Sequence, residues 1–260
     1  MKDAMGENAI KAAEMLMNEH VSGARFHPFA AGAGAADLAG AYAIQREYVR
    51  LQMQARGIGA AGYKVGLTSP RMQAMCKIDR PIAGVVLKDR VHRSGVSLEA
   101  SRYGRVGLEF EIAVRLGRDL KPGDDVAGAI EAVCPAVEIV DDRHCDYATL
   151  DVLSLVADNS WNAGIVLGEF SMCWPDLETI EGVVSSNGQA ADRGWGRDVL
   201  GHPFNSVAWV AQHLGETGQG LHAGDIVMTG NLVTTKFPAE SSIHRFELQG
   251  LGFVELSIRV

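Results

Sequence analysis

The chain has 260 residues, of which 47% are hydrophobic and 22% are charged, and its formal net charge is −8. This composition is usual for a soluble globular protein, and the length allows one large domain or a main domain with a small N-terminal one. The acidic balance, the lack of a Lys and Arg cluster and the lack of an apolar run near the roughly 18 residues of a membrane span argue against nucleic acid and membranes as partners.

The N-terminal part is expected to be helical. Apolar residues recur at spacings of three and four over residues 8–22, which predicts an amphipathic helix. A loop of small residues follows at 30–37, and its Asp37 can cap a second helix that runs to about Gln54 and closes at Gly57. The glycines of this loop have no strand before them and no third glycine after them, so a phosphate-binding loop is not indicated.

From residue 61 onward the pattern favours short strands. AGYKVGL at 61–67 is typical of a strand, and TSPRMQAM after it is typical of a short helix capped by Thr68 or Ser69. AGAIEAV at 127–133 is a candidate helix. Further strands are expected at 82–87, 95–100, 107–116 and 134–141.

The C-terminal part mixes helices with strands. Helices are predicted at 146–158 and at 202–215, the second with Pro203 in its first turn. A strand is expected at 164–168, a turn that leads into a strand at 223–230, and a hairpin about Gln249–Gly252 at the end of the chain. This order predicts an α+β fold with a largely antiparallel or mixed sheet, not a regular βαβ series.

Two glutamates lie two positions apart in GLEFEIAV, residues 107–114. Successive side chains of a strand point to opposite faces, so Glu109 and Glu111 share one face while the apolar residues between them face the core. A carboxylate pair of this kind either lines a solvated sheet face or forms part of a cation site. The spacing alone favours the solvated face.

A third glutamate, Glu138, stands between apolar residues in PAVEIVDD, residues 135–142. A carboxylate in an apolar strand is costly unless it is paired or bound to a cation. Glu109, Glu111 and Glu138 could meet across two strands, and a hard divalent cation such as Mg²⁺ or Mn²⁺ prefers such oxygen ligands.

Five motifs carry a resemblance to a known family. GYKVGLTS, GLEFEIAV, PAVEIVDDR, LVADNSWNAGIVLG and HAGDIVMTG occur in this order. With AYAIQ at 41–45, they resemble the fumarylacetoacetate hydrolase superfamily over about residues 35–258, in particular its 2-hydroxypenta-2,4-dienoate hydratase and 4-oxalocrotonate decarboxylase branch. The resemblance implies a mixed β-roll at 61–260, with a smaller helical region at 1–60 packed on it.

The same resemblance implies roles for individual residues. Glu109, Glu111 and Glu138 would bind the divalent metal, and Lys64 in GYKVG matches the active-site lysine of the family. From the residues alone, Lys64 could pair with the glutamates, bind a substrate carboxylate or transfer a proton once its pKa is lowered, and the alternative is an exposed lysine on an edge strand. Two adjacent pairs match polar substrate-pocket residues of the family: Asn159 with Ser160, and Thr229 with Gly230. From the residues alone, the first pair is also consistent with ordinary helix capping and the second with a turn.

One position departs from the hydratase pattern. Many dienoate hydratases carry an aspartate in an acid–base role shortly after the lysine segment, where this chain has Ile82 in RPIAG. Asp79 lies three residues earlier and would point to the opposite face of a strand, so it is no obvious substitute. An apolar residue at this place resembles the decarboxylase side of the branch.

The resemblance implies a metal-dependent lyase, first a hydratase of small 2-hydroxy or 2-oxo dienoic acids in aromatic-compound degradation. The alternatives are a 4-oxalocrotonate-type decarboxylase, C–C bond hydrolysis, for which His20 and His27 are available near the start of the chain, and a non-catalytic metal-binding module. Family members are usually homo-oligomers. The four cysteines show no metal-type spacing and the N-terminus has no signal-type core, so a cytoplasmic protein with reduced thiols is expected.

Overall fold

The computed structural model describes the backbone of residues 2–30 and 32–260, and the side chains of residues 6–30 and 32–260. Ala31 of the loop predicted at 30–37 therefore lies outside the described residues.

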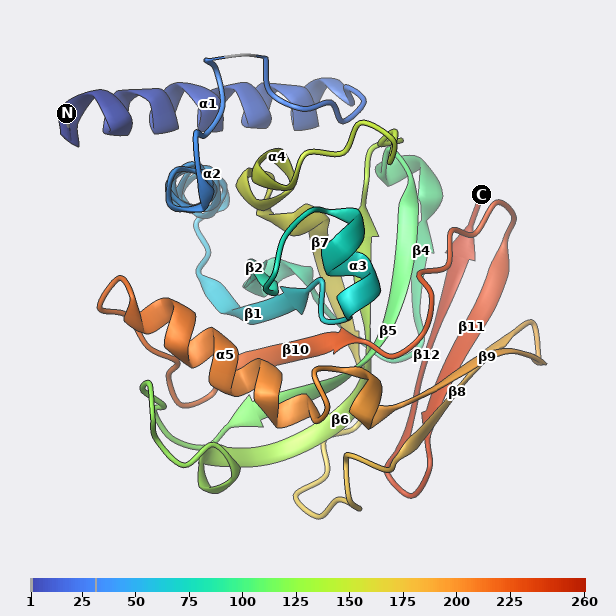
Figure 1. Ribbon diagram of the computed structural model, residues 1–260. Helices are drawn as coiled ribbons and strands as arrows, with labels where there is room; N and C mark the ends of the chain where they lie inside the picture. The colour runs from blue at the N-terminus through green and yellow to red at the C-terminus, as the bar shows by residue number, and fades with distance from the viewer. Residues whose placement is uncertain (1, 31) are drawn as a thin grey trace.

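Two mixed sheets form the body of the molecule (Figure 1). The seven-stranded sheet has the order β2-β1-β10-β5-β6-β7-β3, and the five-stranded sheet has the order β4-β12-β11-β8-β9. The strands are β1 (Ala60–Gly66), β2 (Ile82–Leu87), β3 (Val91–Arg93), β4 (Val96–Glu99), β5 (Val106–Leu116), β6 (Ile130–Asp141), β7 (Asn162–Leu167), β8 (Glu181–Ser186), β9 (Gln189–Trp195), β10 (Ile226–Asn231), β11 (Ser242–Leu248) and β12 (Gly252–Arg259).

The long strand β5 has one face toward the main hydrophobic core and the other toward the inside of the curled seven-stranded sheet. Its apolar residues, Phe110 among them, belong to the main core and pack against the second sheet, where the ring centroids of Phe110 and Phe246 are 5.7 Å apart. Burial of such a side chain stabilises the fold by about 1.5–3 kcal/mol. The alternate residues of β5 lie on the inner face of the seven-stranded sheet, which curls until β2 contacts β7. Ala113 belongs to a small apolar cluster on this inner face.

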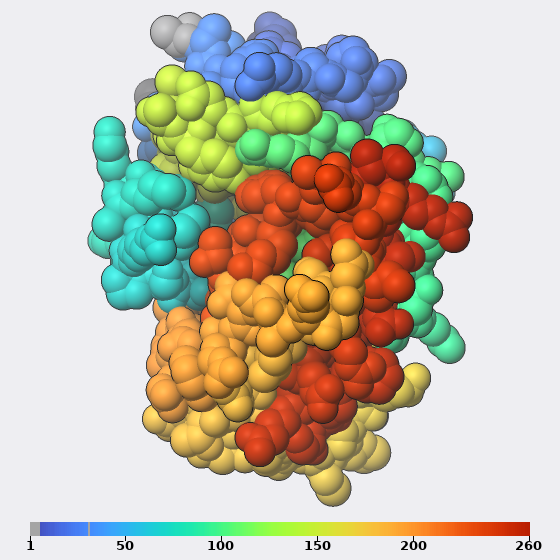
Figure 2. All heavy atoms as spheres, turned by 90° about the vertical axis from the view of Figure 1, so that its right-hand side faces the viewer, coloured from blue at the N-terminus to red at the C-terminus, as the bar shows by residue number. Residues whose placement is uncertain are grey.

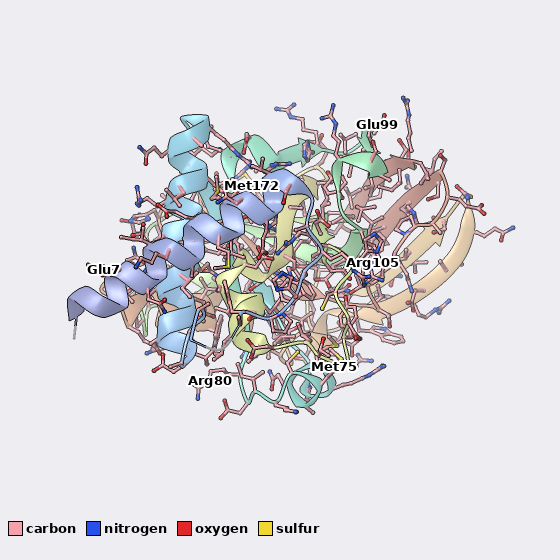
Figure 3. The ribbon with its side chains drawn as sticks, turned by 90° about the horizontal axis from the view of Figure 1, so that it is seen from above. Glu7, Met75, Arg80, Glu99, Arg105 and Met172 are labelled. Carbon is pink, nitrogen blue, oxygen red and sulfur yellow. The ribbon has the colours of Figure 1, made fainter. Side chains whose placement is uncertain are left out.

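Five α-helices cover the sheets in the described part of the chain: α1 (Lys2–Ser22), α2 (Leu38–Arg56), α3 (Pro70–Met75), α4 (Val152–Ala157) and α5 (Pro203–Gly215). Asp37 caps α2 as predicted, because its side chain accepts a hydrogen bond of 2.8 Å from the Gly40 amide. Gly57 ends the helix in the left-handed conformation, at φ 67°. Seen from above, α1 crosses over α2 (Figure 3). None of the described helices is long and apolar enough to cross a membrane.

The α+β fold class is confirmed, and two predicted helices need correction. The helix at 127–133 is wrong, because a 3₁₀ turn at Ala127–Ala129 leads directly into β6. Pairing of Ile130 and the following residues with β5 overrides the local helical pattern. The helix at 146–158 is shorter than predicted and begins only after Asp151, whose side chain accepts a hydrogen bond from the Ser154 amide at 2.8 Å.

The hairpin of β8 and β9 was not predicted, although its turn carries a clear signal. Asn187 and Gly188 connect the two strands with φ values of 50° and 78°. An Asn-Gly pair favours a two-residue hairpin turn, because both positions require positive φ. This pair marks residues 181–195 as a hairpin.

The division of the chain at residue 60 stays a prediction. Helix α2 contacts α4, and the buried amide of Gln45 donates to the backbone oxygens of Ala83 and Val156 at 2.8 Å each. The helical N-terminal region is therefore tied to the β2 strand and to the segment that precedes β7.

Candidate metal centre and adjoining cavity

Neighbouring strands bring three glutamates together on the inner face of the curled sheet. Glu109 of β5 lies directly opposite Glu138 of β6, and Glu111 follows two residues later on the same face. Each offers one carboxylate oxygen, and these oxygens lie within 4.8 Å of one another. Glu111 and Glu138 are completely buried, whereas Glu109 is half-buried.

Each carboxylate is held by a neighbour through one oxygen. Glu109 accepts a hydrogen bond from the Thr235 hydroxyl at 2.7 Å, and Glu111 accepts one from the Gly230 amide at 2.7 Å. The second oxygen of Glu111, Oε1, is buried without a hydrogen-bond partner among the described residues.

Glu138 shows the same asymmetry. Its Oε1 accepts a hydrogen bond from the Asn162 side chain at 2.9 Å and lies 3.2 Å from Nζ of Lys64. Its Oε2 is buried with no partner in the described part of the chain. A buried carboxylate oxygen without a partner is costly, so two such atoms in one place call for a ligand.

Burial dominates the electrostatics of the cluster. It raises the pKa of Glu138 to about 7, although the charge of Lys64 opposes the rise. Burial, followed by the charges of Glu138 and Glu109, raises the pKa of Glu111 well above its ordinary value. Burial alone would lower the pKa of Lys64, but the three carboxylates and the hydrogen bond to Glu138 together raise it above its ordinary value. Lys64 is therefore a buried cation.

The cluster fits a hard divalent cation. Three ionised carboxylates against one ammonium leave two negative charges without a counter-charge. Oxygens that share one ion at about 2.0–2.6 Å lie within about 5 Å of one another, which matches the spacing of these glutamates. The two unpartnered oxygens are the atoms that such an ion would satisfy. Within the described residues, no second group of three His, Cys, Asp or Glu side chains has this spacing.

Thr229 and Gly230 lie beside this cluster at the end of β10. The Thr229 hydroxyl donates to the backbone oxygen of Ile112 at 2.8 Å, so its proton is already used. Gly230 has φ 120°, and a Cβ at this position would lie 2.6 Å from the side chain of Thr68. Glycine has no Cβ and therefore fits this close approach, in which its backbone amide reaches Glu111. The substrate-binding role of both residues stays a prediction.

Asn159 and Ser160 lie in a turn of unusual backbone conformation. Asn159, Ser160 and Trp161 have φ values of 51°, 50° and 59° in succession, a strain of about 1–3 kcal/mol each that the surroundings must hold. The amide of Asn159 exchanges two hydrogen bonds with the backbone of Val85, at 2.7 and 2.9 Å. Ser160 donates to the Ala83 oxygen at 3.2 Å and lines the cavity described below. Their substrate-binding role also stays a prediction.

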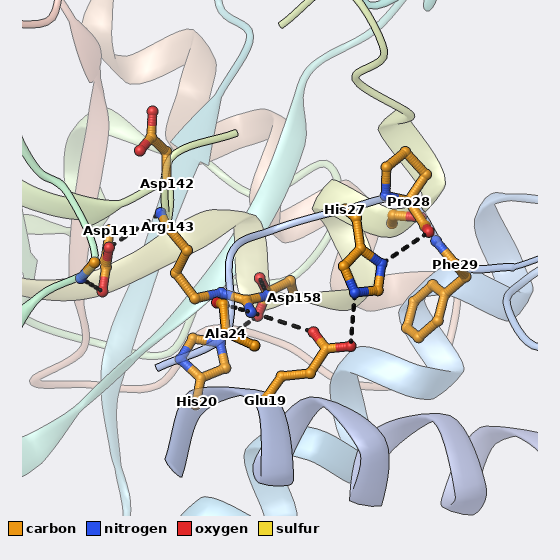
Figure 4. A network of polar contacts seen from close by, with 12 residues as sticks. Glu19, His20, Ala24, His27, Pro28, Phe29, Asp141, Asp142, Arg143 and Asp158 are labelled. Carbon is orange, nitrogen blue, oxygen red and sulfur yellow. Dashed lines mark hydrogen bonds and ion pairs between the residues drawn. The ribbon is translucent and has the colours of Figure 1, made fainter. Parts of the chain in front are cut away.

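A buried ionic network fixes the start of this turn (Figure 4). Asp158 accepts a hydrogen bond from Arg143 at 2.8 Å and lies 2.7 Å from Nε2 of His20. Arg143 also bonds to Glu19 at 3.2 Å and to the Ala24 oxygen at 3.0 Å. Helix α1 thereby supports the turn that ends at the β7 residue bonded to Glu138.

A cavity of ≈ 340 Å³ opens beside the glutamates, and Lys64 and Glu109 belong to its wall. Ile82 also lines it, directly opposite Gly66 in the β1–β2 ladder. Asp79 forms an ion pair with Arg80 instead and is not part of the wall. Figure 2 shows α3 (teal) at the margin of the molecule, beside the yellow-green segment that leads to α4. Many of the other wall residues are apolar: Val65, Leu67, Met72, Met75, Val140, Leu150, Leu155, Trp161, Val233 and Phe237. Polar wall residues stand among them: Thr68, Ser69, Arg71, Tyr147, Ser160, Asn231, Thr234 and Thr235.

Several polar residues of the site were not predicted, and three of them have evident roles. Thr235 and Asn162 each hold a glutamate, and Arg71 lines the cavity. Asn162 stands in the quoted motif LVADNSWNAGIVLG, two residues before the predicted strand at 164–168, and could have been singled out. Nothing in the sequence around Thr235 signals a contact with Glu109, because 126 positions separate them.

Comparisons with known proteins agree with this geometry. Residues 74–259 match the fumarylacetoacetate (FAA) hydrolase C-terminal family. A 2-oxo-hept-4-ene-1,7-dioate hydratase from Escherichia coli is 36% identical over 210 residues, 76% of this chain and 78% of the relative. A 2-keto-4-pentenoate hydratase from Dechloromonas aromatica is 34% identical over 251 residues, 94% of either chain. The solved structure of 4-oxalocrotonate decarboxylase from Pseudomonas putida G7, complexed with magnesium and adipate, has a TM-score of 0.90, 31% identity and 97% coverage of both chains.

Proposed function

Because the chain belongs to the fumarylacetoacetate hydrolase C-terminal family, we propose that it is a divalent-metal-dependent hydratase of small 2-hydroxy or 2-oxo dienoic acids. The observation that carries the proposal is the pair of buried, unpartnered oxygens of Glu111 and Glu138 beside a cavity. A purely structural ion site would need no cavity of ≈ 340 Å³ next to it. The relatives that share most of the chain are hydratases and a decarboxylase, which makes a lyase the natural class.

Glu109, Glu111 and Glu138 would hold the ion, and Mg²⁺ or Mn²⁺ suits their oxygen ligands. When bound, it would act as a Lewis acid toward the two adjacent oxygens of a 2-oxo acid. The partners of the glutamates fix their orientation before any ligand arrives, which lowers the cost of binding.

Lys64 provides a buried positive charge at the site. Its raised pKa keeps the ammonium protonated, and its Nζ lies against Glu138 at the wall of the cavity. It can therefore donate a hydrogen bond to a substrate oxygen and stabilise negative charge that develops there. The apolar wall orients the carbon chain and limits water to the polar end of the cavity.

One observation favours a second candidate, decarboxylation. Ile82 is buried and lines the cavity where many dienoate hydratases carry an aspartate. Among the wall residues Glu109 is the one carboxylate, so an acid–base group for adding water is less evident than an oxygen-binding centre. The decarboxylase of similar structure supports the same alternative. C–C hydrolysis gains no such support, because His20 and His27 contact Asp158 and Glu19 and are not wall residues.

We further propose that the enzyme acts as a homo-oligomer in the cytoplasm. Its four cysteines are free thiols, which suits a reducing compartment. Ile243 and Phe253 are exposed on neighbouring strands of the second sheet and could pack against another copy. Sedimentation velocity would measure the mass in solution, and a purely monomeric protein would contradict the oligomer.

The reaction is tested with two substrates. The protein and Mg²⁺ are incubated with 2-hydroxypenta-2,4-dienoate and, separately, with 4-oxalocrotonate. Loss of the ultraviolet absorbance of the diene without release of CO₂ supports the hydratase, and release of CO₂ from 4-oxalocrotonate supports the decarboxylase. Failure of the metal-loaded protein to convert either compound contradicts both.

A further inference from the structure

The positive charges near the cavity differ in whether they are already paired. Lys64 is tied to Glu138 at the buried end. Arg105 lies behind the wall, where it forms an ion pair with the buried Asp142 and its guanidinium stacks 4.7 Å from the ring centroid of Phe237. Neither cation is free to bind a second negative group of a substrate.

Arg71 differs from both. It belongs to the first turn of α3, a helix without buried residues, and it lines the cavity together with Met72 and Met75 of the same helix. In the part of the chain that the structure describes, Arg71 forms no ion pair. The cavity wall therefore contains the half-buried Glu109, the buried Lys64 and one exposed guanidinium that forms no ion pair among the described residues.

Apolar side chains make up much of the cavity wall to which Glu109 and Arg71 both belong. Leu150, Leu155 and Val140 belong to the wall, as does Phe237. An alkyl or alkenyl chain fits such a surface, whereas a ligand with polar groups along its length would lose hydrogen bonds to water. An unpaired guanidinium beside an apolar wall matches an anionic end group, and its planar fork suits a carboxylate.

We propose that Arg71 binds a second carboxylate, at the end of the substrate remote from the glutamates, and makes the enzyme selective for dicarboxylic substrates. This inference rests on the proposed function, because it takes the 2-oxo acid end of the substrate to lie at the glutamate cluster. The relatives named above include enzymes of mono- and dicarboxylic acids, so the family alone does not decide between the two classes.

Binding of two unreactive 2-oxo acids separates this inference from the reaction itself. 2-Oxoadipate and 2-oxohexanoate share the 2-oxo acid end and differ in the second carboxylate. Calorimetric titration in the presence of Mg²⁺ is expected to show that wild type binds 2-oxoadipate about tenfold more tightly, the usual strength of one charged hydrogen-bonded contact. Arg71→Gln should remove this preference, and Arg71→Lys should keep part of it.

Arg80→Gln is the matched control. Arg80 is exposed near α3, is paired with Asp79 and is not a wall residue, and Figure 3 shows it at the same margin of the molecule as Met75. The control should retain the tenfold preference. Equal affinity of wild type for the two acids, or an unchanged preference in Arg71→Gln, would overturn the inference.

Turnover then distinguishes the two proposals. If metal-loaded wild type converts a dienoic acid but shows no preference for 2-oxoadipate, the role of Arg71 is refuted and the proposed function stands. If wild type binds 2-oxoadipate preferentially through Arg71 but converts neither mono- nor dicarboxylic dienoates, the second-carboxylate site stands and the reaction is refuted.

Discussion

The carboxylates of Glu111 and Glu138 are as deeply buried as that of Asp158, but their partners differ. Asp158 is bonded to Arg143 and His20, one through each oxygen. Glu111 and Glu138 each have one oxygen bonded and one without a partner among the described residues. Both oxygens of Asp158 therefore have partners within the chain, although Nε of Arg143 has none among the described residues, whereas the single cation Lys64 cannot balance the three glutamates.

This difference separates a structural from a functional use of buried charge. Closed ion pairs need no ligand, and breaking them costs stability because one charge is left buried alone. An open cluster keeps like charges together at a cost in stability, and a ligand that neutralises them binds strongly. The turn from Asp158 to Asn162 joins the two regions. Asn162 donates a hydrogen bond to Glu138, so the network around Asp158 helps to position this metal ligand.

The largest expected effect comes from removing a charge of the open cluster. Glu111→Gln keeps the shape of the side chain but removes a ligand, and a metal supplies several kcal/mol of transition-state stabilisation. We expect metal-dependent turnover to fall by about a thousandfold or more. The metal-free variant should resist urea better than wild type, because burial and the neighbouring carboxylates disfavour the ionised form of Glu111, as its raised pKa shows, and glutamine carries no charge.

Glu131→Gln is the matched control on β6, since Glu131 is exposed and pairs with Arg115. It should leave turnover at the wild-type level. Full turnover of folded Glu111→Gln in the presence of EDTA would refute the metal centre.

Breaking the closed network should instead act on stability. Arg143→Met leaves Asp158 buried without its cation, and we expect the free energy of unfolding to fall by about 3 kcal/mol. Urea denaturation measures the change. Arg193→Met removes an exposed pair with Glu181 and should cost less than about 1 kcal/mol. An equal, small loss in both variants would show that the network is not structural.

Gly230→Ala should affect the packing of β10 against Thr68 and the metal ligand Glu111 beside it. The added Cβ would lie 2.6 Å from the Thr68 side chain, and alanine would have to adopt φ 120°, which L residues rarely do. We therefore expect the free energy of unfolding to fall by about 2 kcal/mol and metal binding to weaken. Gly218→Ala is the control, because Gly218 has φ 74° but no atom within 4 Å of an added Cβ. A Gly230→Ala protein that binds metal as wild type does would contradict the close approach to Glu111.

The smallest expected effect is the pH dependence of metal binding. Burial raises the pKa of Glu138 from 4.5 to about 7, so the metal-free fold retains a proton that the unfolded chain releases. This carboxyl stabilises the metal-free protein at low pH, and its contribution is lost as the pH rises from 4.5 through about 7.

Because the ion must displace that proton, we expect about tenfold weaker Mg²⁺ binding at pH 6 than at pH 8. The rise in melting temperature on adding Mg²⁺ should therefore be larger at pH 8. A larger rise at pH 6 would contradict the displacement of a proton.

Strand periodicity made the glutamate pair predictable. The alternation of Leu108, Phe110 and Ile112 with Glu109 and Glu111 fixed which residues share a face. The same reasoning failed at 127–133, where a short apolar segment without alternation suits a helix or a strand and pairing with β5 decides.

Contacts between distant segments could not be predicted in this way. The meeting of Glu138 with Glu109 depends on the register of β5 and β6, so the residues alone indicated only that the glutamates could meet, and the family resemblance made this the expectation. His20 and Asp158 are 138 positions apart, and each is an ordinary polar residue within its own segment. Helix packing, not a local pattern, creates the closed network.

Titration of the protein with Mn²⁺ at pH 8, followed by calorimetry, tests the central difference between the two clusters most directly. Wild type and Glu131→Gln should each bind one ion per chain at the glutamate cluster, and Glu138→Gln should bind none while remaining folded by circular dichroism. Binding of Mn²⁺ by folded Glu138→Gln with the affinity of wild type would contradict the account.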